Sequence, residues 1–323
     1  MTNQTQTTYS GDLSSWMSGL DDALTMAQLS VPGTHDSGTK KISAGPSHTQ
    51  NFGIAQQLAD GIRFLDIRLA KSSPKTPDDP LQVNHGSVSC DITFGDVLNH
   101  CSVFLAANPR EVIFMLVNDA YGDATDPTVY DGFQAYLGNP AYQNLFCVSA
   151  TPARLALSQL RGKVVLLRRF FAPDGVELGL NLQEQGKNFA GVGWPNKYSY
   201  TFDTTTPDGQ TTLHIEDQYK THDTSQKMQA VSAALDKAAA TPADGTLYIT
   251  FNSIAFASGH TPYQYAWSVQ GAMNPALEAY FSNKFANSTS PARLGFVVLD
   301  FYNNETGHLD NRNVQMVIGT NFG

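Results

Sequence analysis

The sequence is poor in cysteine. The three cysteines among its 323 residues, Cys90, Cys101 and Cys147, are too few and too odd in number for a disulfide framework, and their spacing fits no zinc site. We expect three free, packed thiols, with a bond between Cys90 and Cys101 as the alternative.

Charge is also scarce. Charged residues make up 15% of the chain, and 20 basic against 29 acidic side chains give a net charge of −9. Since nucleic-acid binding draws on clustered lysine and arginine, this balance argues against a nucleic-acid partner. It also argues against strong attraction to anionic membranes and leaves weak contact with a membrane surface.

Long hydrophobic runs are missing as well. No apolar stretch reaches the roughly 18 residues needed to span a bilayer, so we expect no transmembrane segment. Residues 1–10 lack the charged and apolar regions of a signal peptide. With so few charges, the surface must be rich in neutral polar groups, which is common outside the cell. We therefore expect a secreted protein in its mature form.

Hydrophobic residues make up 41% of the sequence, enough for a large core. Short apolar runs alternate with stretches of helical periodicity, a pattern typical of a parallel sheet with helices around it. We predict that residues 1–323 form one domain, a single, distorted parallel β/α barrel of the TIM type, closed on itself. The expected strands lie at about 29–31, 61–69, 81–86, 111–119, 163–169, 246–252 and 295–300. The expected helices lie at about 11–20, where the helix plugs one end of the barrel, 52–59, 93–108, 128–137, 224–240 and 273–284.

Polar side chains with catalytic potential follow these apolar runs. In a parallel barrel the carboxyl ends of the strands meet at one rim, where such enzymes keep their chemistry. Within residues 61–69, Asp66 and Arg68 interrupt a buried pattern, so they should share one polar cluster. The barrel would gather at its rim His35, Asp36, Asp66, Arg68, His85, Asn118, Arg169 and Asp300.

Two histidines beside an arginine indicate phosphoryl transfer. One imidazole can accept a proton from an attacking hydroxyl while the other donates one to a leaving oxygen. The guanidinium of Arg68 suits two phosphoryl oxygens, and aspartates can fix the tautomer of each imidazole. This set needs no metal. The alternative readings are a structural ion pair for Asp66 and Arg68 and an N-cap loop for the residues around His35.

Several motifs resemble those of bacterial phosphatidylinositol-specific phospholipases C, in the same order and at similar spacing across about residues 12–318. The first is highly diagnostic, and the others are weak singly but strong together. They are Ser30–Thr39, Arg63–Arg68, Asn84–Gly86, Asn108–Ile113, Gly162–Arg169, Gly193–Pro195, Glu216–Lys220 and Gly295–Phe301.

The resemblance implies cleavage of phosphatidylinositol to diacylglycerol and inositol 1,2-cyclic phosphate. It makes His35 the general base for the inositol 2-hydroxyl, oriented by Asp300. His85, supported by Asp36, becomes the general acid for the leaving oxygen.

The resemblance assigns further roles to polar residues around the histidines. Arg68 would hold a phosphate oxygen, with Asp66 organising that cluster. Arg169 and Asp217 would bind inositol hydroxyls, and Tyr219 would stack on the ring.

The chain departs from the family pattern at Asn118, where metal-free bacterial members usually carry a lysine. Eukaryotic relatives hold calcium in the corresponding cluster. Asp36, Asp66 and Asn118, with Asp119, could supply the oxygen ligands that Ca²⁺ prefers. Arg68 argues the other way, since it resembles the arginine that replaces the ion. Calcium and a metal-free site both remain open.

A second departure concerns the rim that faces the membrane. Residues 42–49 lack the large apolar group of the relatives, so interfacial binding should be weak. Tyr263, Tyr265 and Trp267 are the remaining candidates for lipid contact, with core packing as the alternative.

Two other functions stay open at this level. One is a glycerophosphodiester phosphodiesterase, although that family opens with His-Arg-Gly where this chain has His-Asp-Ser. The other is a non-catalytic inositol- or glycan-binding barrel, which gives no reason for two histidines near Arg68.

Overall fold

The parallel strands of the sheet come from the whole length of the chain. The computed structural model describes residues 8–43, 45–72, 79–184, 192–196, 198–241, 245–255, 259–285, 288–304 and 311–322. The parallel strands are β1 (Ser30–Thr34), β2 (Phe64–Lys71), β5 (Ile113–Asp119), β6 (Phe146–Cys147), β7 (Val164–Arg169), β8 (Leu180–Asn181), β10 (Thr212–Glu216), β11 (Leu247–Phe251) and β12 (Gly295–Leu299). Most are buried along their full length, as expected of a parallel sheet covered on both faces.

These strands pair in the order β6-β7-β5-β2-β1-β12-β11-β10-β9, and β9 (Thr201–Thr205) is antiparallel to β10. The predicted distorted barrel is confirmed, but full closure is not. Among the described residues, only the isolated bridges Gln183–Trp194 and Val192–Thr205 link the side of β8 to the side of β9. The sheet is therefore a curled, partly open barrel.

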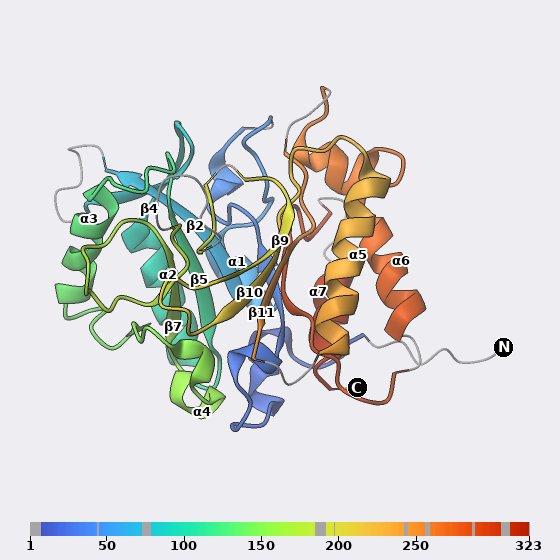
Figure 1. Ribbon diagram of the computed structural model, residues 1–323, viewed down its shortest axis with the longest axis horizontal. Helices are drawn as coiled ribbons and strands as arrows, with labels where there is room; N and C mark the ends of the chain where they lie inside the picture. Colours follow the sequence, from blue (N-terminus) through green and yellow to red (C-terminus); the bar gives the residue numbers. More distant parts are fainter. Residues whose placement is uncertain are drawn as a thin grey trace.

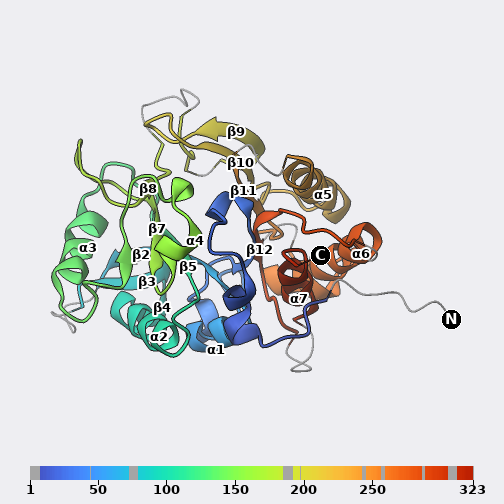
Figure 2. The same ribbon diagram turned by 90° about the horizontal axis from the view of Figure 1, so that it is seen from below.

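Helices surround this curled sheet (Figures 1 and 2). They are α1 (Ile54–Ala59), α2 (Phe94–Ala107), α3 (Thr128–Gly138), α4 (Leu157–Leu160), α5 (Thr224–Ala240), α6 (Met273–Phe285) and α7 (Arg312–Gly319). The helices α5, α6 and α7 lie together on one side, and α2 and α3 lie on the other (Figure 1). The helices predicted near 52–59, 93–108, 128–137, 224–240 and 273–284 are confirmed, with small differences in bounds.

One predicted strand has a different place in the sheet. The segment at 81–86 is β3 (Leu81–His85), which pairs antiparallel with β2 and with β4 (Val88–Thr93). The strand β2 continues to Lys71, and β3 runs back along it with Val83 opposite Leu69. His85 therefore reaches the rim on a returning hairpin and not at the end of a parallel strand.

Short helical turns complete the described structure: η1 (Leu13–Gly19), η2 (Met26–Gln28), η3 (Thr39–Lys41), η4 (Pro152–Arg154) and η5 (Gln264–Ser268). The predicted helix at 11–20 is η1, a kinked 3₁₀ segment. Cys90 and Cys101 are buried, and all three cysteines are free thiols, as predicted.

The interior of the barrel is filled by aromatic rings below the rim. The ring centroid of Phe296 lies 4.9 Å from that of Phe64 and 5.1 Å from that of Phe114. A Cβ on Gly33 would lie 2.8 Å from the Cβ of Phe64, so glycine is required for this close approach. Above this packed layer, β2 directs Asp66 and Arg68 to the same side as Phe64, because alternate residues of a strand share a face.

The opposite end of the barrel is closed by a buried ion pair. The Nε of Arg63 lies 2.8 Å from Oε2 of Glu111, and both side chains are buried. The Glu111 carboxylate also accepts the backbone N–H groups of Met17 and Ser18, and the indole of Trp16 donates to the carbonyl of Gly61. The predicted plug is therefore confirmed.

This pair predicts a large stability effect without a catalytic one. Arg63→Met should lower the free energy of unfolding by about 3–5 kcal/mol, because it leaves the Glu111 carboxylate buried without its partner. Urea denaturation of the variant and of Arg110→Met checks this, since Arg110 forms an exposed pair with Asp22 and should matter far less. Equal losses in the two variants would contradict the prediction.

Candidate active site

A cavity of about 240 Å³ lies inside the rim at the carboxyl ends of the strands. The side chains of both predicted catalytic histidines, His35 and His85, line this cavity. Its polar lining includes His35, Asp66, Arg68, His85, Asn118, Asp119, Arg169, Asn196, Asp217 and Tyr219. Asp36 and Asp300 contact the histidines from behind. All the predicted site residues are therefore brought to one place.

The loop after β1 is tied to both neighbouring strands. The amide of His35 donates to a carbonyl of β12 at 3.0 Å, and that of Ser37 donates to the carbonyl of Asp66 at 2.9 Å. The amide group of Gln50 donates to the carbonyl of His35 at 2.9 Å. Between these anchors Asp36 adopts a φ of 43°, a conformation rare outside glycine that persists only where the surroundings enforce it.

His35 is oriented by Asp300. Its Nδ1 lies 2.8 Å from Oδ1 of Asp300, whose side chain is buried. The following residue, Phe301, also has a positive φ, 43°. This contact makes Nδ1 the protonated nitrogen of a neutral imidazole and directs Nε2 away from Asp300.

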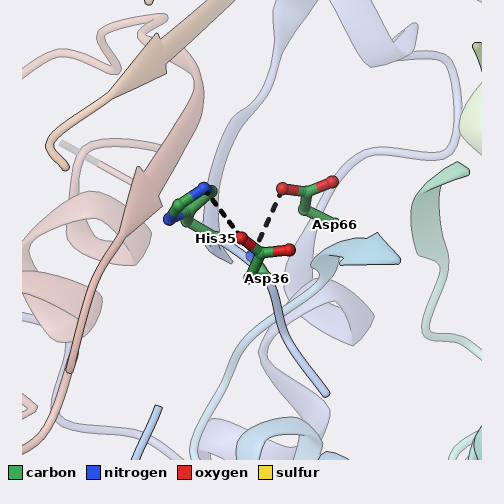
Figure 3. A group of neighbouring side chains, drawn as sticks. All are labelled: His35, Asp36 and Asp66. Carbon is green, nitrogen blue, oxygen red and sulfur yellow. Dashed lines mark hydrogen bonds and ion pairs between the residues drawn. The ribbon is translucent and has the colours of Figure 1, made fainter. Parts of the chain in front are cut away.

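The Asp36 carboxylate lies at the centre of the cluster. Its Oδ2 is 3.2 Å from Nε2 of His35 and 3.1 Å from Nε2 of His85, and its Oδ1 is 2.8 Å from Nε of Arg68. Asp36 also donates its backbone N–H to Oδ2 of Asp66 (Figure 3). Burial favours the neutral acid, but Arg68 and the two imidazoles outweigh it and hold the pKa of Asp36 well below its usual range.

Arg68 connects the two halves of the cluster. Its Nη2 lies 2.9 Å from Nε2 of His35 and 3.5 Å from Oδ2 of Asp66, so the predicted cluster of Asp66 and Arg68 is confirmed. Burial opposes the guanidinium charge, yet Asp36 and Asp66 raise the pKa of Arg68 above its ordinary value. The arginine is a permanent cation in this site.

The donor groups fix a proton arrangement. A guanidinium can only donate, so its 2.9 Å contact makes Nε2 of His35 an acceptor. Nε2 of His85 lies 3.1 Å from the shared Oδ2 of Asp36, a contact that favours the tautomer with a proton on that nitrogen. When His35 is neutral, its Nε2 therefore carries a lone pair that accepts from Arg68, while the other imidazole carries a proton. A general base and a general acid require this arrangement.

Protonation of His35 is strongly favoured by its surroundings. Burial disfavours the imidazolium, but Asp300 and then Asp36 outweigh burial and raise the pKa of His35 to about 9. The neutral form that accepts from Arg68 therefore gains population as the pH rises towards that value.

The opposite wall carries Arg169, which stacks on Trp194. The Cζ of Arg169 lies 3.9 Å from the centroid of the Trp194 ring. Its Nη2 donates at 3.3–3.4 Å to the carbonyls of Trp194 and Pro195 and to Oδ1 of Asn196. Within the described residues, Nε of Arg169 has no partner. The segment Trp194–Asn196 thus holds a guanidinium that keeps a donor for a ligand.

Two further polar groups have capacity for a ligand. The carboxylate of Asp217 lines the cavity, and the buried Oδ1 of Asn118 has no hydrogen-bond partner in the described part of the chain. Burial raises the pKa of Asp217 to about 7, against the opposing effect of Lys227 and Arg169. Tyr219 lines the same wall.

A metal ion fits this cluster poorly. His35, Asp36 and Asp66 place ligand atoms within 4.8 Å of one another. However, both oxygens of Asp36 contact Arg68 or a histidine, and Arg68 also contacts Asp66. Among the described residues, Oδ1 of Asp66, Oδ1 of Asn118 and Oδ2 of Asp36 have no hydrogen-bond partner, and the last lies within 3.2 Å of both imidazoles. Ca²⁺ takes six to eight oxygen ligands.

Of the three aromatic residues proposed for lipid contact, one belongs to the core and two are half-buried. Tyr265 is buried, the ring of Tyr263 packs against Phe301, and the indole of Trp267 donates to the carbonyl of Phe301. Tyr121, which is 56% exposed, lies at the cavity instead. Residues 44 and 256–258 of the predicted rim lie outside the described residues.

Sequence reasoning missed Gln50 and the role of Trp194. Gln50 gave no signal, because a lone glutamine in a loop is ordinary until both carbonyls it reaches are known. Trp194 belongs to a motif of the resemblance, but its stacking on Arg169 depends on contact between distant segments.

Comparisons with known proteins agree with this site. Residues 36–170 match the family Phosphatidylinositol-specific phospholipase C, X domain. The chain is 29% identical over 295 residues to a 1-phosphatidylinositol phosphodiesterase of Staphylococcus aureus (strain Newman), covering 88% of this chain and 87% of the relative. The corresponding protein of Listeria monocytogenes is 28% identical over 304 residues, covering 90% and 82%.

Solved structures show the same likeness. A structure of the phosphatidylinositol-specific phospholipase C from Staphylococcus aureus superposes with a TM-score of 0.80 at 27% identity, covering 97% of this chain and 99% of that chain. The enzyme from Listeria monocytogenes superposes with a TM-score of 0.69 at 23% identity, covering 96% and 99%, and supports the fold.

A parallel barrel whose rim brings paired imidazoles and a guanidinium into one cavity has the architecture of an acid–base phosphodiesterase. The matched domain and the likeness along nearly the whole chain specify the family. Residues 36–170 carry the X domain of the phosphatidylinositol-specific phospholipases C, and the chain is similar to bacterial enzymes of this kind along nearly its whole length.

The raised pKa of His35 predicts a pH dependence. If neutral His35 is the base, kcat/KM should rise with pH until about pH 9, where its proton is lost. Asp300→Asn removes the carboxylate that most favours the imidazolium, so it should move this rise to lower pH while lowering the maximal rate about 10²–10⁴-fold. Rate profiles of both proteins check this, and an unchanged midpoint in the variant would contradict it.

Proposed function

We propose that this protein cleaves phosphatidylinositol to diacylglycerol and inositol 1,2-cyclic phosphate. The observation that carries the proposal is the contact of both imidazoles with one oxygen of Asp36 inside a single cavity beside Arg68. Family membership supplies the substrate class.

In this mechanism Nε2 of His35 takes the proton of the inositol 2-hydroxyl. The 2-oxygen then forms a bond to phosphorus as the bond from phosphorus to the glycerol oxygen breaks. His85 gives its Nε2 proton to that departing oxygen. The guanidinium of Arg68 stabilises the charge that develops on a non-bridging phosphate oxygen.

Supporting residues act through these three. Asp300 keeps the Nδ1 proton on His35, and Asp36 holds the His85 ring in the cavity through its contact with Nε2. Slow hydrolysis of the cyclic product reverses the two roles, with His85 taking a proton from water.

We place the inositol ring against the opposite wall. The unpartnered Nε of Arg169 and the carboxylate of Asp217 suit its hydroxyl groups, and Tyr219 offers a ring face. Substitution of Arg169, Asp217 or Tyr219 should therefore raise KM more than it lowers kcat, because these residues contact a part of the substrate that does not react.

We further propose that Arg68 works in place of a metal ion. It contacts one carboxylate oxygen of Asp36 and one of Asp66 as well as Nε2 of His35, and so places a positive charge where a cation would lie. The calcium set of Asp36, Asp66 and Asn118 is the alternative.

Chelation separates these two cases. Activity should be retained after exhaustive removal of divalent cations, because the guanidinium is part of the chain. Assays on chelated enzyme with and without added Ca²⁺ check this. Loss of activity that Ca²⁺ restores would support the alternative ligand set.

The two histidines should respond differently to the leaving group. His35→Ala and His85→Ala should each lower turnover of phosphatidylinositol about 10²–10⁴-fold. A substrate with a nitrophenolate leaving group needs no general acid, so it should recover the rate of His85→Ala and not that of His35→Ala. His100→Ala is the matched control, because His100 is an exposed histidine on α2. Full activity of His35→Ala or of His85→Ala would contradict the mechanism.

The same assay tests the remaining alternatives. Faster turnover of glycerophosphodiesters than of phosphatidylinositol would favour the glycerophosphodiesterase reading. Binding of myo-inositol without any turnover would favour a non-catalytic barrel.

We also propose a secreted protein that touches membranes weakly. The scarcity of charge and the net charge of −9 support both points. Among the described residues no helix has the length and hydropathy of a membrane-spanning segment. Two measurements check this. The activity should be recovered from cell-free medium, and little of the protein should bind to lipid vesicles.

A further inference from the structure

A second cavity, of about 370 Å³, lies on the other face of β7 from the active site. Arg169 faces the catalytic cavity, and the preceding residue, Arg168, lines the second one. Successive residues of a strand point to opposite faces, so the guanidinium groups of Arg168 and Arg169 lie on opposite sides of β7 and line different cavities.

Strand pairing places three donor side chains on this second face. Arg168 is the parallel partner of Asn181 on β8, and paired residues of neighbouring strands share a face. Gln183 lies two residues beyond Asn181 and therefore points the same way. All three line the cavity.

The guanidinium of Arg168 is buried without a counter-ion. It is 5% exposed, and its Nε and Nη1 donate at 3.1 and 2.6 Å to the carbonyls of Leu178 and Phe170. Among the described residues no carboxylate lies within 4.0 Å of it. Burial lowers its pKa to about 10. An unpaired buried charge is costly, which favours an anionic ligand.

The two amides have free donors as well. Gln183 is 7% exposed, and its buried Nε2 has no partner in the described part of the chain. Oδ1 of Asn181 accepts the backbone N–H of Gln183 at 3.0 Å, so Nδ2 is the group left for a ligand. One guanidinium-bearing and two amide-bearing side chains thus line the cavity.

Two carboxylates, Asp174 and Glu184, also line this cavity. Asp174 is exposed and Glu184 half-buried. They weaken the local positive potential, but they do not satisfy the three donors. A ligand with several acceptor oxygens does satisfy them.

We propose that this cavity binds a phosphate-type oxyanion, free or carried on a lipid headgroup, through Arg168, Asn181 and Gln183. Phosphate matches the site because its oxygens accept from a guanidinium fork and from neighbouring amides at once. The proposal goes beyond the proposed function, and its test requires no turnover.

Equilibrium dialysis with radiolabelled inorganic phosphate at fixed ionic strength tests the site. Arg68→Met removes the guanidinium of the catalytic cavity, and this variant should still bind phosphate. Adding Gln183→Met should weaken the remaining binding about tenfold, the effect of losing one charge-assisted hydrogen bond. Arg68→Met with Arg154→Met is the matched control, because Arg154 is exposed and its side chain donates to Gln210 at the surface.

The comparison depends on folded variants, so circular dichroism and a melting curve accompany it. Gln183→Met carries the test because it keeps the side-chain length and leaves in place the hydrogen bonds of Arg168 to Leu178 and Phe170. Absence of phosphate binding in Arg68→Met, or binding that Gln183→Met leaves unchanged, would overturn the proposal and leave Arg168 a structural tie to the loop at 170–178.

A second arm identifies the source of the anion. Binding to phosphatidylcholine vesicles is measured with and without phosphatidic acid. If Gln183→Met reduces the increase in vesicle binding that phosphatidic acid causes, the oxyanion belongs to a lipid headgroup. If it reduces only the binding of inorganic phosphate, the ligand is free in solution.

Discussion

The site depends on one buried carboxylate, that of Asp36. Burying an ionised carboxylate is costly unless charged or hydrogen-bonding partners compensate. Asp36 has three such partners, since Arg68 contacts one oxygen and His35 and His85 contact the other. Its stability as an anion therefore requires that β1, β2 and the β3–β4 hairpin meet, and the same contacts place the two imidazoles in one cavity.

The barrel supplies the rigidity that this arrangement needs. The residues around the cavity follow strands that are buried along their length, and packed aromatic rings form the layer below. Strained backbone occurs at Asp36 and Phe301, each next to a residue of the His35–Asp300 pair. Such conformations persist only when the surrounding hydrogen bonds enforce them, and the anchors at Ser37 and Gln50 do so here.

Charge in this molecule is separated into independent clusters. The Arg63–Glu111 pair closes the amino end of the barrel, the cluster around Asp36 lies at the carboxyl end, and Lys227 pairs with Glu216 beside the Asp217 wall. The first is structural, because it also holds the backbone of η1. Arg168 departs from this pattern, since within the described residues it is a buried cation that no carboxylate compensates.

The sequence by itself determined which groups gather at the rim. Apolar runs that end in His35, Asp66, Asn118, Arg169 or Asp300 indicate buried parallel strands, and the carboxyl ends of such strands share one rim. The first motif and its companions also identified the family. These signals are local, because burial and periodicity act within a few residues.

Only the tertiary structure decided how the groups meet. His85 reaches the cavity on a hairpin antiparallel to β2. Arg63, just before β2, pairs at the far end, while Arg68 on β2 joins the site. Arg168 and Arg169 face different cavities. The physical reason is that the partner of a strand, and hence the face and level of each side chain, is set by residues far away in the chain.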